Sequence, residues 1–485
     1  MLNATTLPSV KTLAELPAPK ALPLIGNLHQ IELEHFHEQL EKWCDELGPI
    51  FKIRMGMRDI VCISDSRTIN QMLKERPSMY RRVRSIESIT SEMKIKGVFS
   101  AEGDEWKLQR KVVALALNSA HINRFFGKLY ATTENLERRW QKLASNGTSV
   151  ELCRDVMRYT VDVTTQLAFG INVDTIGTDG PVVQQHLDKV FPTLHRRINA
   201  PFPYWRYFRL PSDRALDRSL AVIEDTVNKI IVECRERMEK DRSLYESPTN
   251  FLEAIISAQA SESGSDFTDK QIYANVLTLL LAGEDTTANT IAWACKYFID
   301  YPDHFARARA EVDQVLGASD IPDSPEQLKE FPFIEAFVNE TMRLKPVGPI
   351  APMETNEAVE LLGCYIPAGT SIFGLLRHIA IDQRNFERAK EFDPERWLVK
   401  REAASSAHDT TAFLPFGSGP RFCPGRNLAL TEIKMVIAML CRNFDLSLAN
   451  PDIPVEEKLA FAMMPKNLNV RFTRRSSSPN KRLDE

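Results

Sequence analysis

The stretch Phe413 to Leu430 reads F-L-P-F-G-S-G-P-R-F-C-P-G-R-N-L-A-L and places one cysteine, Cys423, between a glycine-rich loop and a helical pattern. Gly417 and Gly419 precede this cysteine, and a Pro-Gly pair follows it. Proline is favoured at the start of a helix because its missing N–H would have no partner there. We therefore expect Cys423 at a helix N-terminus, where free N–H groups and the helix dipole favour the thiolate. The glycines let backbone amides approach the sulfur, as a metal-ligating cysteine requires.

The composition is that of a globular chain with a large core. Of 485 residues 43% are apolar and 26% are charged, which excludes a collagenous or disordered protein. The net charge of −4 gives the molecule as a whole no attraction for nucleic acid. Eight scattered cysteines contain no C-x-x-C, so neither a zinc ribbon nor a disulfide framework fits. We expect a reducing compartment, the cytoplasm.

The two ends of the chain are expected to lie outside the folded domain. The first twelve residues lack a basic region and a continuous apolar stretch, so no signal peptide is expected. No window reaches the roughly 18 apolar residues of a membrane span, which predicts a soluble protein. We expect an N-terminal extension over residues 1–16 and a disordered polar tail over residues 473–485.

Between these ends, residues 17–472 are predicted to form a single domain, mainly α with small β-sheets. Helical periods dominate from about Asp65 to Arg343, and the glycine content of 20 is too low for a turn-rich sandwich. The expected hairpin covers Gly48 to Ser64 around Gly56, and strand-like pieces return from Val359 to Ile372. The clearest expected helices are Trp106–Leu117, Ser219–Lys240, Asp269–Asp300 and a last one from just after Pro424 to Asn443.

The cysteine segment matches the pattern F-x-x-G-x-R-x-C-x-G at Phe416, Gly419, Arg421, Cys423 and Gly425. It resembles the haem-binding signature of the cytochrome P-450 family; the alternative for a lone cysteine is a structural residue in a turn. The resemblance implies a haem b cofactor with Cys423 as the iron ligand and with Phe416, Arg421 and Gly425 in the cofactor-binding loop. It also implies the family fold, a triangular prism with the haem between a long distal helix and the proximal cysteine loop and helix.

A second motif, A-G-E-D-T, lies inside a long apolar helix from Ala282 to Thr286. An acid and an alcohol in such a helix are costly unless they have partners or a function. The Thr286 hydroxyl can bond the carbonyl of Ala282 one turn back and loosen the helix. The family's distal helix carries A-G-x-D/E-T, so the resemblance implies that Asp285 and Thr286 are the catalytic pair that delivers protons during oxygen activation, with Ala282 beside the cofactor. A helix kink with a surface salt bridge is the alternative.

Glu340 and Arg343 stand three residues apart on one helix face. An isolated pair of this kind is more often solvated. The family has E-x-x-R here, joined by an arginine from a later P-E-R-F stretch, which is P-E-R-W in this chain. The resemblance therefore implies a structural, buried network of Glu340, Arg343 and Arg396.

Trp106 and Arg110 are four residues apart on a predicted helix, so their donor groups face one way. The family's W-x-x-x-R donates to haem propionates; the alternative is a core tryptophan beside a snorkelling arginine. The chain departs from the family before Ile366-Pro367-Ala368-Gly369, where Met353 stands in place of the usual arginine or histidine. One propionate donor is therefore unassigned.

Family positions also indicate the walls of a substrate chamber, although any core contains such residues. The chamber must be dry and apolar for oxygen insertion into a C–H bond. An apolar substrate such as a fatty acid, terpenoid or steroid is expected, and the sequence does not name it or its site of attack. The predicted walls, besides Ala282, are Val98, Phe99, Thr278, Val347, Ile350 and Met463.

Two basic stretches could bear on selectivity. Arg81, Arg82 and Arg84 could hold a substrate carboxylate, although a solvated face is favoured. Residues 195–209 interleave aromatics and arginines, a pattern that can grip RNA or rest on a membrane. In the family this place is a mobile lid, and we prefer that interpretation; no nucleic acid partner is expected.

Electrons must come from outside the chain, because no flavin or nicotinamide fingerprint is present. We expect an external ferredoxin or flavodoxin with its reductase, docking near Cys423 on positive charge from Arg426, Lys434 and Arg442. Length and motifs resemble the longer membrane-enzyme branch of the family without its anchor helix. A soluble bacterial enzyme explains this, and so does a trimmed anchor.

The sequence thus predicts an oxidoreductase, a haem-thiolate monooxygenase that uses O2 and two electrons to hydroxylate or epoxidise an apolar small molecule. One alternative keeps the haem but uses peroxide, or isomerises or dehydrates an oxygenated substrate. The acid–alcohol pair argues against it. The other alternative is a haem protein that binds ligands without turnover.

Overall fold

The computed structural model describes residues 10–178, 190–198, 200, 202–261, 266–398 and 408–475. Residues 1–9 of the predicted extension and residues 476–485 of the predicted tail lie outside the described residues. The chain divides into two compact units. Unit 1 comprises Met1–Glu87, Gly348–Glu391 and Ser406–Phe422, and unit 2 comprises Ser88–Val347, Phe392–Ser405 and Cys423–Glu485. The single domain over residues 17–472 stays a prediction.

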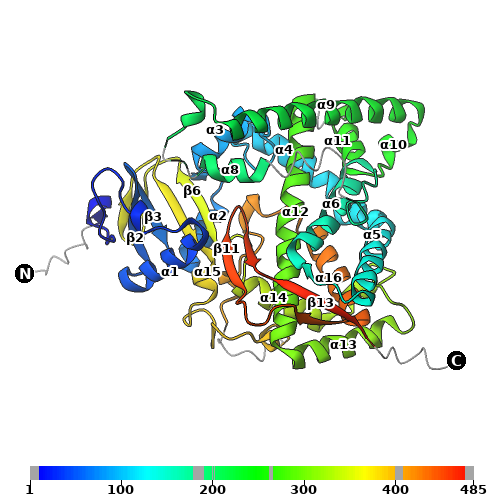
Figure 1. Cartoon of the computed structure of the whole chain (residues 1–485). Helices are drawn as coiled ribbons and strands as arrows, with labels where there is room; N and C mark the ends of the chain where they lie inside the picture. The colour runs from blue at the N-terminus through cyan, green and yellow to red at the C-terminus, as the bar shows by residue number, and fades with distance from the viewer. Residues whose placement is uncertain are drawn as a thin grey trace, which may run out of the picture. The chain divides into compact units, whose positions relative to one another are not determined.

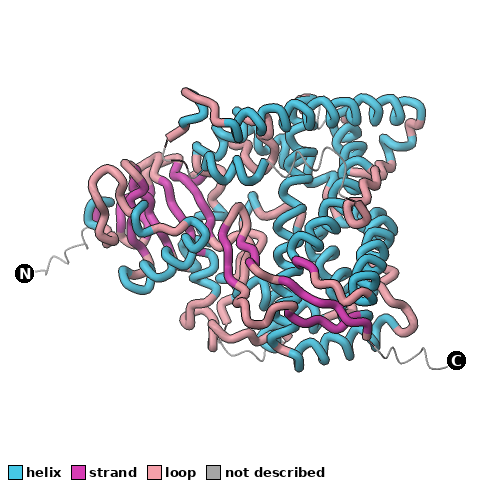
Figure 2. Tube along the Cα trace, in the orientation of Figure 1, coloured by secondary structure: helices cyan, strands magenta, loops and turns pink. Residues whose placement is uncertain are grey.

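Unit 1 holds most of the strands, drawn as arrows in Figure 1 and coloured by type in Figure 2. Its five-stranded sheet has the order β2-β3-β9-β6-β4, with β3 and β9 parallel and the other pairs antiparallel. A three-stranded sheet has the order β1-β8-β7. The strands are β1 (Lys11–Thr12), β2 (Ile50–Met55), β3 (Arg58–Ile63), β4 (Tyr80–Arg81), β6 (Ile350–Thr355), β7 (Val359–Leu361), β8 (Cys364–Ile366) and β9 (Ser371–Leu375).

The predicted hairpin is confirmed as β2 and β3, which turn at Gly56 with a φ of 61°. On one face of this pair Phe51 and Ile53 of β2 stand opposite Cys62 and Ile60 of β3, and all four are buried. Val61 and Ile63 point to the other face and are also buried, so β3 is covered on both faces. The helices of unit 1 are α1 (Phe36–Leu47), α2 (Ser66–Lys74), α15 (Leu376–Ala380) and the 3₁₀ turns η1 (Leu13–Glu15), η2 (Leu28–Gln30), η3 (Leu33–His35), η8 (Thr410–Ala412) and η9 (Gly419–Arg421). Helix α3 (Arg84–Glu92) crosses the boundary between the units in sequence.

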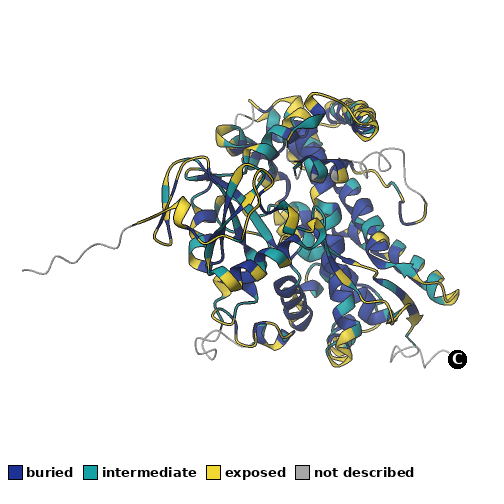
Figure 3. Cartoon of the chain, turned by 60° about the vertical axis from the view of Figure 1, so that its left-hand side comes forward, coloured by how far each residue is buried: buried dark blue, intermediate teal, exposed yellow. Residues whose placement is uncertain are grey.

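Unit 2 is built from long helices, and the expected fold class, mainly α with small sheets, is confirmed. Figure 3 shows buried residues along these helices and exposed residues at their outer turns. The helices are α4 (Gly103–Ala116), α5 (Ser119–Ser145), α6 (Leu152–Phe169), α8 (Val190–Ile198), η4 (Tyr204–Arg206), α9 (Pro211–Lys240), α10 (Ser243–Glu246), α11 (Phe251–Ala260), α12 (Asp269–Asp300), α13 (Pro302–Leu316), η6 (Gln327–Lys329), α14 (Pro332–Leu344), η7 (Pro394–Trp397) and α16 (Arg426–Asn443).

Two small sheets complete unit 2. Strand β13 (Asn469–Arg474) pairs with β10 (Phe444–Leu448) and with β5 (Val150–Glu151), and β11 (Glu456–Leu459) forms a hairpin with β12 (Met463–Lys466). Among the described residues, no helix combines the length and the apolar character needed to cross a bilayer.

Helix α12 is the central element of unit 2 and contacts α6, α14, α16 and β12 (Figure 1). Its bounds are those expected from the sequence, because both ends carry strong signals. At the start, Thr268 and Gln271 form a capping box that satisfies two free N–H groups. At the end, Pro302 cannot continue the helix and begins the next one.

Candidate functional site

Cys423 lies two residues before the N-cap of α16, which is Gly425. The last helix thus begins after Pro424, as predicted, although the proline precedes the helix instead of opening it. Asn427 in the first turn donates from its side-chain amide to Ser119 Oγ at 3.1 Å, which fixes the start of α16 against α5. Cys423 is the only one of the eight cysteines that is not buried.

The electrostatics at the Cys423 sulfur are balanced between opposing causes. Burial raises the pKa of its thiol, whereas the backbone N–H groups of Gly425 and Arg426 and the charge of Arg110 lower it. The sequence predicted a helix N-terminus that favours the thiolate, and the donors it requires are in place. Burial outweighs them, so the net shift of the pKa is upward.

Two of the predicted cofactor donors lie on α4 in the same unit as Cys423. Trp106 is buried and Arg110 is half-buried. Desolvation lowers the pKa of the Arg110 guanidinium, and the charge of Cys423 raises it, so the two groups are within electrostatic reach of each other. An anion beside Arg110 would offset its desolvation.

The A-G-E-D-T motif occupies the middle of α12 without breaking it. The Thr286 hydroxyl donates to the Ala282 carbonyl at 2.9 Å, as predicted, and the helix stays continuous through this point. Ala282 is exposed, while Asp285 and Thr286 are half-buried, although the flanking turns of α12 are buried. A small, open patch in the middle of a buried helix is a surface that can receive a ligand.

Sequence analysis missed the contact that α6 makes with this motif. The Thr160 hydroxyl donates to the Glu284 carbonyl at 3.0 Å. A Cβ added to Gly283 would lie 2.5 Å from the Thr164 methyl carbon, so only glycine lets the two helices approach so closely. The motif's glycine is thus explained by packing, and the threonines of α6 carried no recognisable signal.

The trio of Glu340, Arg343 and Arg396 comes together as predicted. Arg343 donates to both oxygens of Glu340, at 2.8 and 2.7 Å, and Arg396 donates to Oε1 at 2.9 Å. Trp397 and the backbone N–H of Asp393 add two further hydrogen bonds at 2.9 Å each. Glu340 and Arg343 are fully buried, so their charges stabilise each other away from water.

Five of the six predicted chamber residues lie in unit 2, and a backbone hydrogen bond joins two of them, Met463 and Val347. The ring of Phe99 lies 6.1 Å from that of Phe461, in the turn between β11 and β12. The Met463 N–H donates to the Val347 carbonyl at 2.8 Å. Val98, Phe99, Thr278 and Val347 are all half-buried, but Met463 is fully buried. The half-buried Phe461, which sequence analysis missed, is the better wall residue of this hairpin.

The remaining predicted residues belong to unit 1. Ile350 opens β6, Phe416 is half-buried, and Arg421 ends η9. Gly419 has a φ of 69°, and a Cβ there would lie 2.4 Å from the Leu73 carbonyl oxygen. This glycine of the motif is therefore required where the loop passes α2.

Met353, the departure from the family pattern, is fully buried in β6. The following residue, Glu354, forms an ion pair with Arg84 at 3.0 Å. Arg81 pairs with Glu87. Two of the three arginines considered for a substrate carboxylate are thus engaged by carboxylates of this chain, which argues against that role.

One expectation about electron transfer is wrong. Arg442 is buried and bonds Asp313 at 2.8 Å, because it ties α16 to α13, so it offers no charge to a docking partner. Lys434 is engaged with Glu335 and with the Leu328 carbonyl. Arg426 is exposed, as a docking residue must be.

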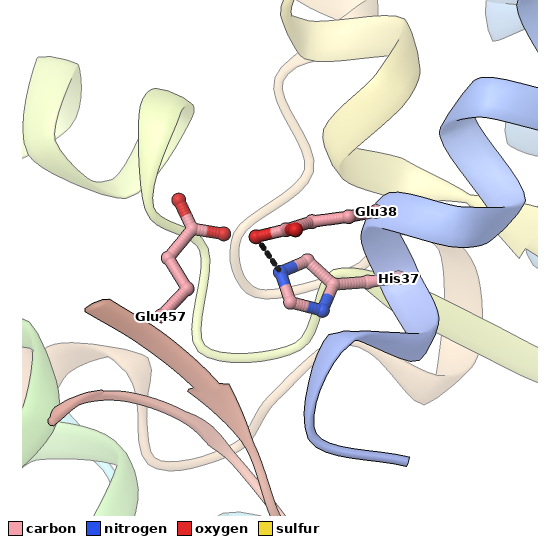
Figure 4. A group of neighbouring side chains, drawn as sticks. All are labelled: His37, Glu38 and Glu457. Carbon is pink, nitrogen blue, oxygen red and sulfur yellow. Dashed lines mark ion pairs between the residues drawn. The ribbon is translucent and has the colours of Figure 1, made fainter. Parts of the chain in front are cut away.

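A further group of possible metal ligands begins in α1 of unit 1. His37 and Glu38 form an ion pair of 3.9 Å, drawn as the dashed line in Figure 4. The third side chain labelled there, Glu457, belongs to unit 2, where it pairs with Lys345. Two neighbouring ligands from one helix do not make a metal site, and we assign this pair no chemistry.

Comparison with known proteins gives consistent results. A family model described as Cytochrome P450 matches residues 16–472. The chain is 26% identical over 444 residues to Protein LUTEIN DEFICIENT 5, chloroplastic, of Arabidopsis thaliana, covering 90% of this chain and 74% of the relative. It is 26% identical over 424 residues to Carotene epsilon-monooxygenase, chloroplastic, of the same plant, covering 85% and 77%.

A self-sufficient cytochrome P450 monooxygenase of Penicillium expansum is 25% identical over 472 residues, covering 96% of this chain and 44% of the relative. The chain thus spans about three quarters of the plant relatives and less than half of the fungal one. Because the family model matches nearly the whole sequence, the chain belongs to the cytochrome P450 family, the monooxygenase family that its cysteine motif predicts.

Proposed function

We propose that this chain is a haem-thiolate monooxygenase in which Cys423 binds the haem iron and one oxygen atom of O2 is inserted into an apolar small molecule. Membership of the family implies the haem. The observation that carries the proposal is the single accessible cysteine, with two backbone N–H groups directed at its sulfur and the charge of Arg110 nearby. When bound, a haem with a thiolate ligand supplies the electron density that favours O–O cleavage.

The residues of unit 2 fit such a group. Ala282 leaves an exposed, small patch on α12 where a flat macrocycle can lie. We assign Trp106 and Arg110 to the propionates by their places in the W-x-x-x-R motif, which α4 carries in the same unit as Cys423. Phe416, Arg421 and Gly425 are assigned to the cofactor by their places in the motif.

We assign proton delivery to Asp285 and Thr286. The Thr286 hydroxyl donates its own proton to the Ala282 carbonyl, so its oxygen keeps lone pairs that can accept a hydrogen bond from a proton donor. Asp285 is half-buried beside it and can exchange protons with water. This arrangement holds a proton next to the open patch of α12 and suits general acid catalysis.

The proposed substrate is apolar and contacts Val98, Phe99, Thr278, Val347, Ile350 and Met463, together with Phe461. Terpenoids, fatty acids and steroids meet this requirement. Similarity to a protein named as a carotene monooxygenase supports beginning with carotenoids among the terpenoids. The two plant relatives carry chloroplastic names, so the cytoplasm remains a prediction for this chain.

The proposed electron donor is a ferredoxin or flavodoxin with its reductase, docking on the face that presents Arg426. Relatives named as self-sufficient make a fused donor the competing arrangement. The two are separated by adding purified ferredoxin and flavodoxin pairs to the chain and following reduction of the haem.

Turnover of a substrate panel tests the proposal. Carotenoids, fatty acids and steroids are first screened for a low-to-high-spin shift of the iron. The best ligand is then incubated either with NADPH and a reductase pair or with peroxide alone. Product that forms with the reductase pair supports a monooxygenase, and product that forms only with peroxide identifies a peroxygenase. Binding without product under either condition identifies a ligand-binding haem protein.

A further inference from the structure

Between α3 and α4, residues 96–99 carry two of the proposed chamber walls, Val98 and Phe99. The Val98 N–H donates to Asn275 Oδ1 of α12 at 2.8 Å. The Asn275 side-chain amide donates to Gln109 Oε1 of α4 at 3.0 Å. Gln109 Nε2 in turn donates to the Lys96 carbonyl at 3.4 Å. These three hydrogen bonds join the loop, α4 and α12.

Both amide side chains are buried: the exposed fraction is 1% for Asn275 and 0% for Gln109. Asn275 also donates to the Gln271 carbonyl at 2.8 Å, so its orientation is fixed from its own helix. A buried amide with its oxygen and nitrogen both engaged is held in one geometry, because any rotation would leave a polar atom unpaired.

Gly97 supplies a second, independent observation. A Cβ on this residue would lie 2.1 Å from Thr278 Oγ1 and 2.6 Å from the Ala274 carbonyl oxygen. The loop backbone therefore lies in direct contact with α12. Thr278 donates its hydroxyl proton to Ala274 at 2.7 Å, inside its own helix. Of the two polar side chains, Asn275 therefore holds the loop, and Thr278 is a surface on which it rests.

Other contacts of this segment are made by side chains at its surface: Lys96 pairs with Glu105 at 2.8 Å, and the Phe99 ring lies 6.1 Å from that of Phe461. Lys96, Val98 and Phe99 are each half-exposed, so apolar burial does not hold these residues as it holds a core segment. Gln109 also stands three residues after Trp106 and directly before Arg110, on the helix that carries both proposed propionate donors.

We propose that Asn275 and Gln109 are positioning residues that lock residues 96–99 onto α12 and thereby set the shape of the substrate chamber. The proposal rests on the proposed function, since it deepens the role of Val98 and Phe99. The apolar wall of the chamber is then held in place by two buried polar side chains behind it. Substrate selectivity is then determined partly by two amides that need not touch the substrate.

The first test follows amide hydrogen exchange in the haem-loaded chain. Asn275→Leu removes the acceptor of the Val98 N–H, and exchange at residues 96–99 should accelerate about tenfold. Asn275→Asp keeps an oxygen acceptor and should retain most of the protection at Val98. If Asn275→Leu does not fold, the Asn275→Leu/Gln109→Leu double variant carries the test, because removing both partners leaves neither amide unpaired.

The second test compares the Kd values of two small molecules that bind the haem iron, each measured by spectral titration. Imidazole reports access to the iron, and 4-phenylimidazole also reaches the chamber wall. In Asn275→Leu the Kd of 4-phenylimidazole should rise about tenfold while that of imidazole changes less than about twofold. Asn289→Leu is the matched control, since Asn289 is equally buried on the same helix and its Oδ1 has no hydrogen-bond partner among the described residues.

Unchanged exchange at Val98 in Asn275→Leu would overturn the proposal, as would equal effects of Asn289→Leu. Equal weakening of both imidazoles would also overturn it, because the variant would then act on the haem site as a whole. Failure of the proposed function is distinguishable: the unmodified chain would then lack a thiolate-type carbon monoxide spectrum, while the exchange measurement would still report the loop.

Discussion

Unit 2 contains two polar clusters that differ in how deeply they are buried. Around Glu340 the charges are buried, and among the described residues its carboxylate accepts five hydrogen bonds. In the middle of α12, Ala282 is exposed and Asp285 and Thr286 are half-buried. The saturated Glu340 cluster has no bonding capacity left for a ligand, so we expect it to act on stability. The open cluster on α12 is accessible to a ligand, so we propose that it acts on chemistry.

The largest expected effect is that of replacing Cys423, the proposed iron ligand. Cys423→Ala should abolish the carbon monoxide difference band at the thiolate position and all product formation, because no other described cysteine is accessible to replace it. Cys364→Ala is the matched control, since that cysteine is buried in β8. A surviving band in the Cys423 variant would show that another side chain binds the iron.

Substitutions in the saturated Glu340 cluster should lower the free energy of unfolding. Glu340→Gln leaves Arg343 and Arg396 buried without a countercharge, and we expect a loss of about 3–5 kcal/mol in the free energy of unfolding. Urea denaturation followed by circular dichroism measures it. The control is Glu326→Gln, which breaks an exposed pair with Lys329 and should cost about 0.5 kcal/mol or less. Similar losses in both variants would mean that the buried network is not saturated.

Substitutions in the open cluster on α12 should lower the rate of product formation and leave the stability of the fold nearly unchanged. Thr286→Val removes the hydroxyl at constant shape and should lower product formation about 10²-fold while the carbon monoxide spectrum persists. Thr290→Val is the control, because its hydroxyl bonds the Thr286 carbonyl one turn further on. Full activity in Thr286→Val would assign the acid–alcohol pair to helix packing instead.

The smallest effect concerns Glu432, a buried acid of α16 that contrasts with Glu340. Its Oε2 has no hydrogen-bond partner among the described residues, and burial raises its pKa well above the ordinary value. The folded state then binds this proton more tightly than the unfolded state, so stability falls as the pH rises above about 4.3.

Glu432→Gln cannot titrate and should be more stable than the unmodified chain at neutral pH, with a flatter dependence between pH 4 and 7. Denaturation midpoints across this range measure the difference. Parallel curves for the two proteins would show that Glu432 is ionised in the folded chain or finds a partner there.

Much of the fold was predictable from local signals. The bounds of α12 follow from a capping box at Thr268 and a proline at 302, and the β2–β3 hairpin follows from alternation around Gly56. The Glu340 trio and the Thr286 hydrogen bond could be predicted because their partners stand at fixed spacings or in recognised motifs. Arg442 was misplaced because nothing in a single sequence separates an exposed arginine from one that pairs with an aspartate 129 residues away.

The sequence by itself determined the cysteine, its glycine-rich loop, the distal helix and the family, since each is a matter of local spacing and backbone conformation. Only the tertiary structure decided which side chains meet across long separations. Asn275 reaches Val98 and Gln109, α6 presses Thr164 against Gly283, and Phe461 meets Phe99. These contacts depend on how helices pack, and packing is set by the shape of the whole core and not by any one segment's pattern.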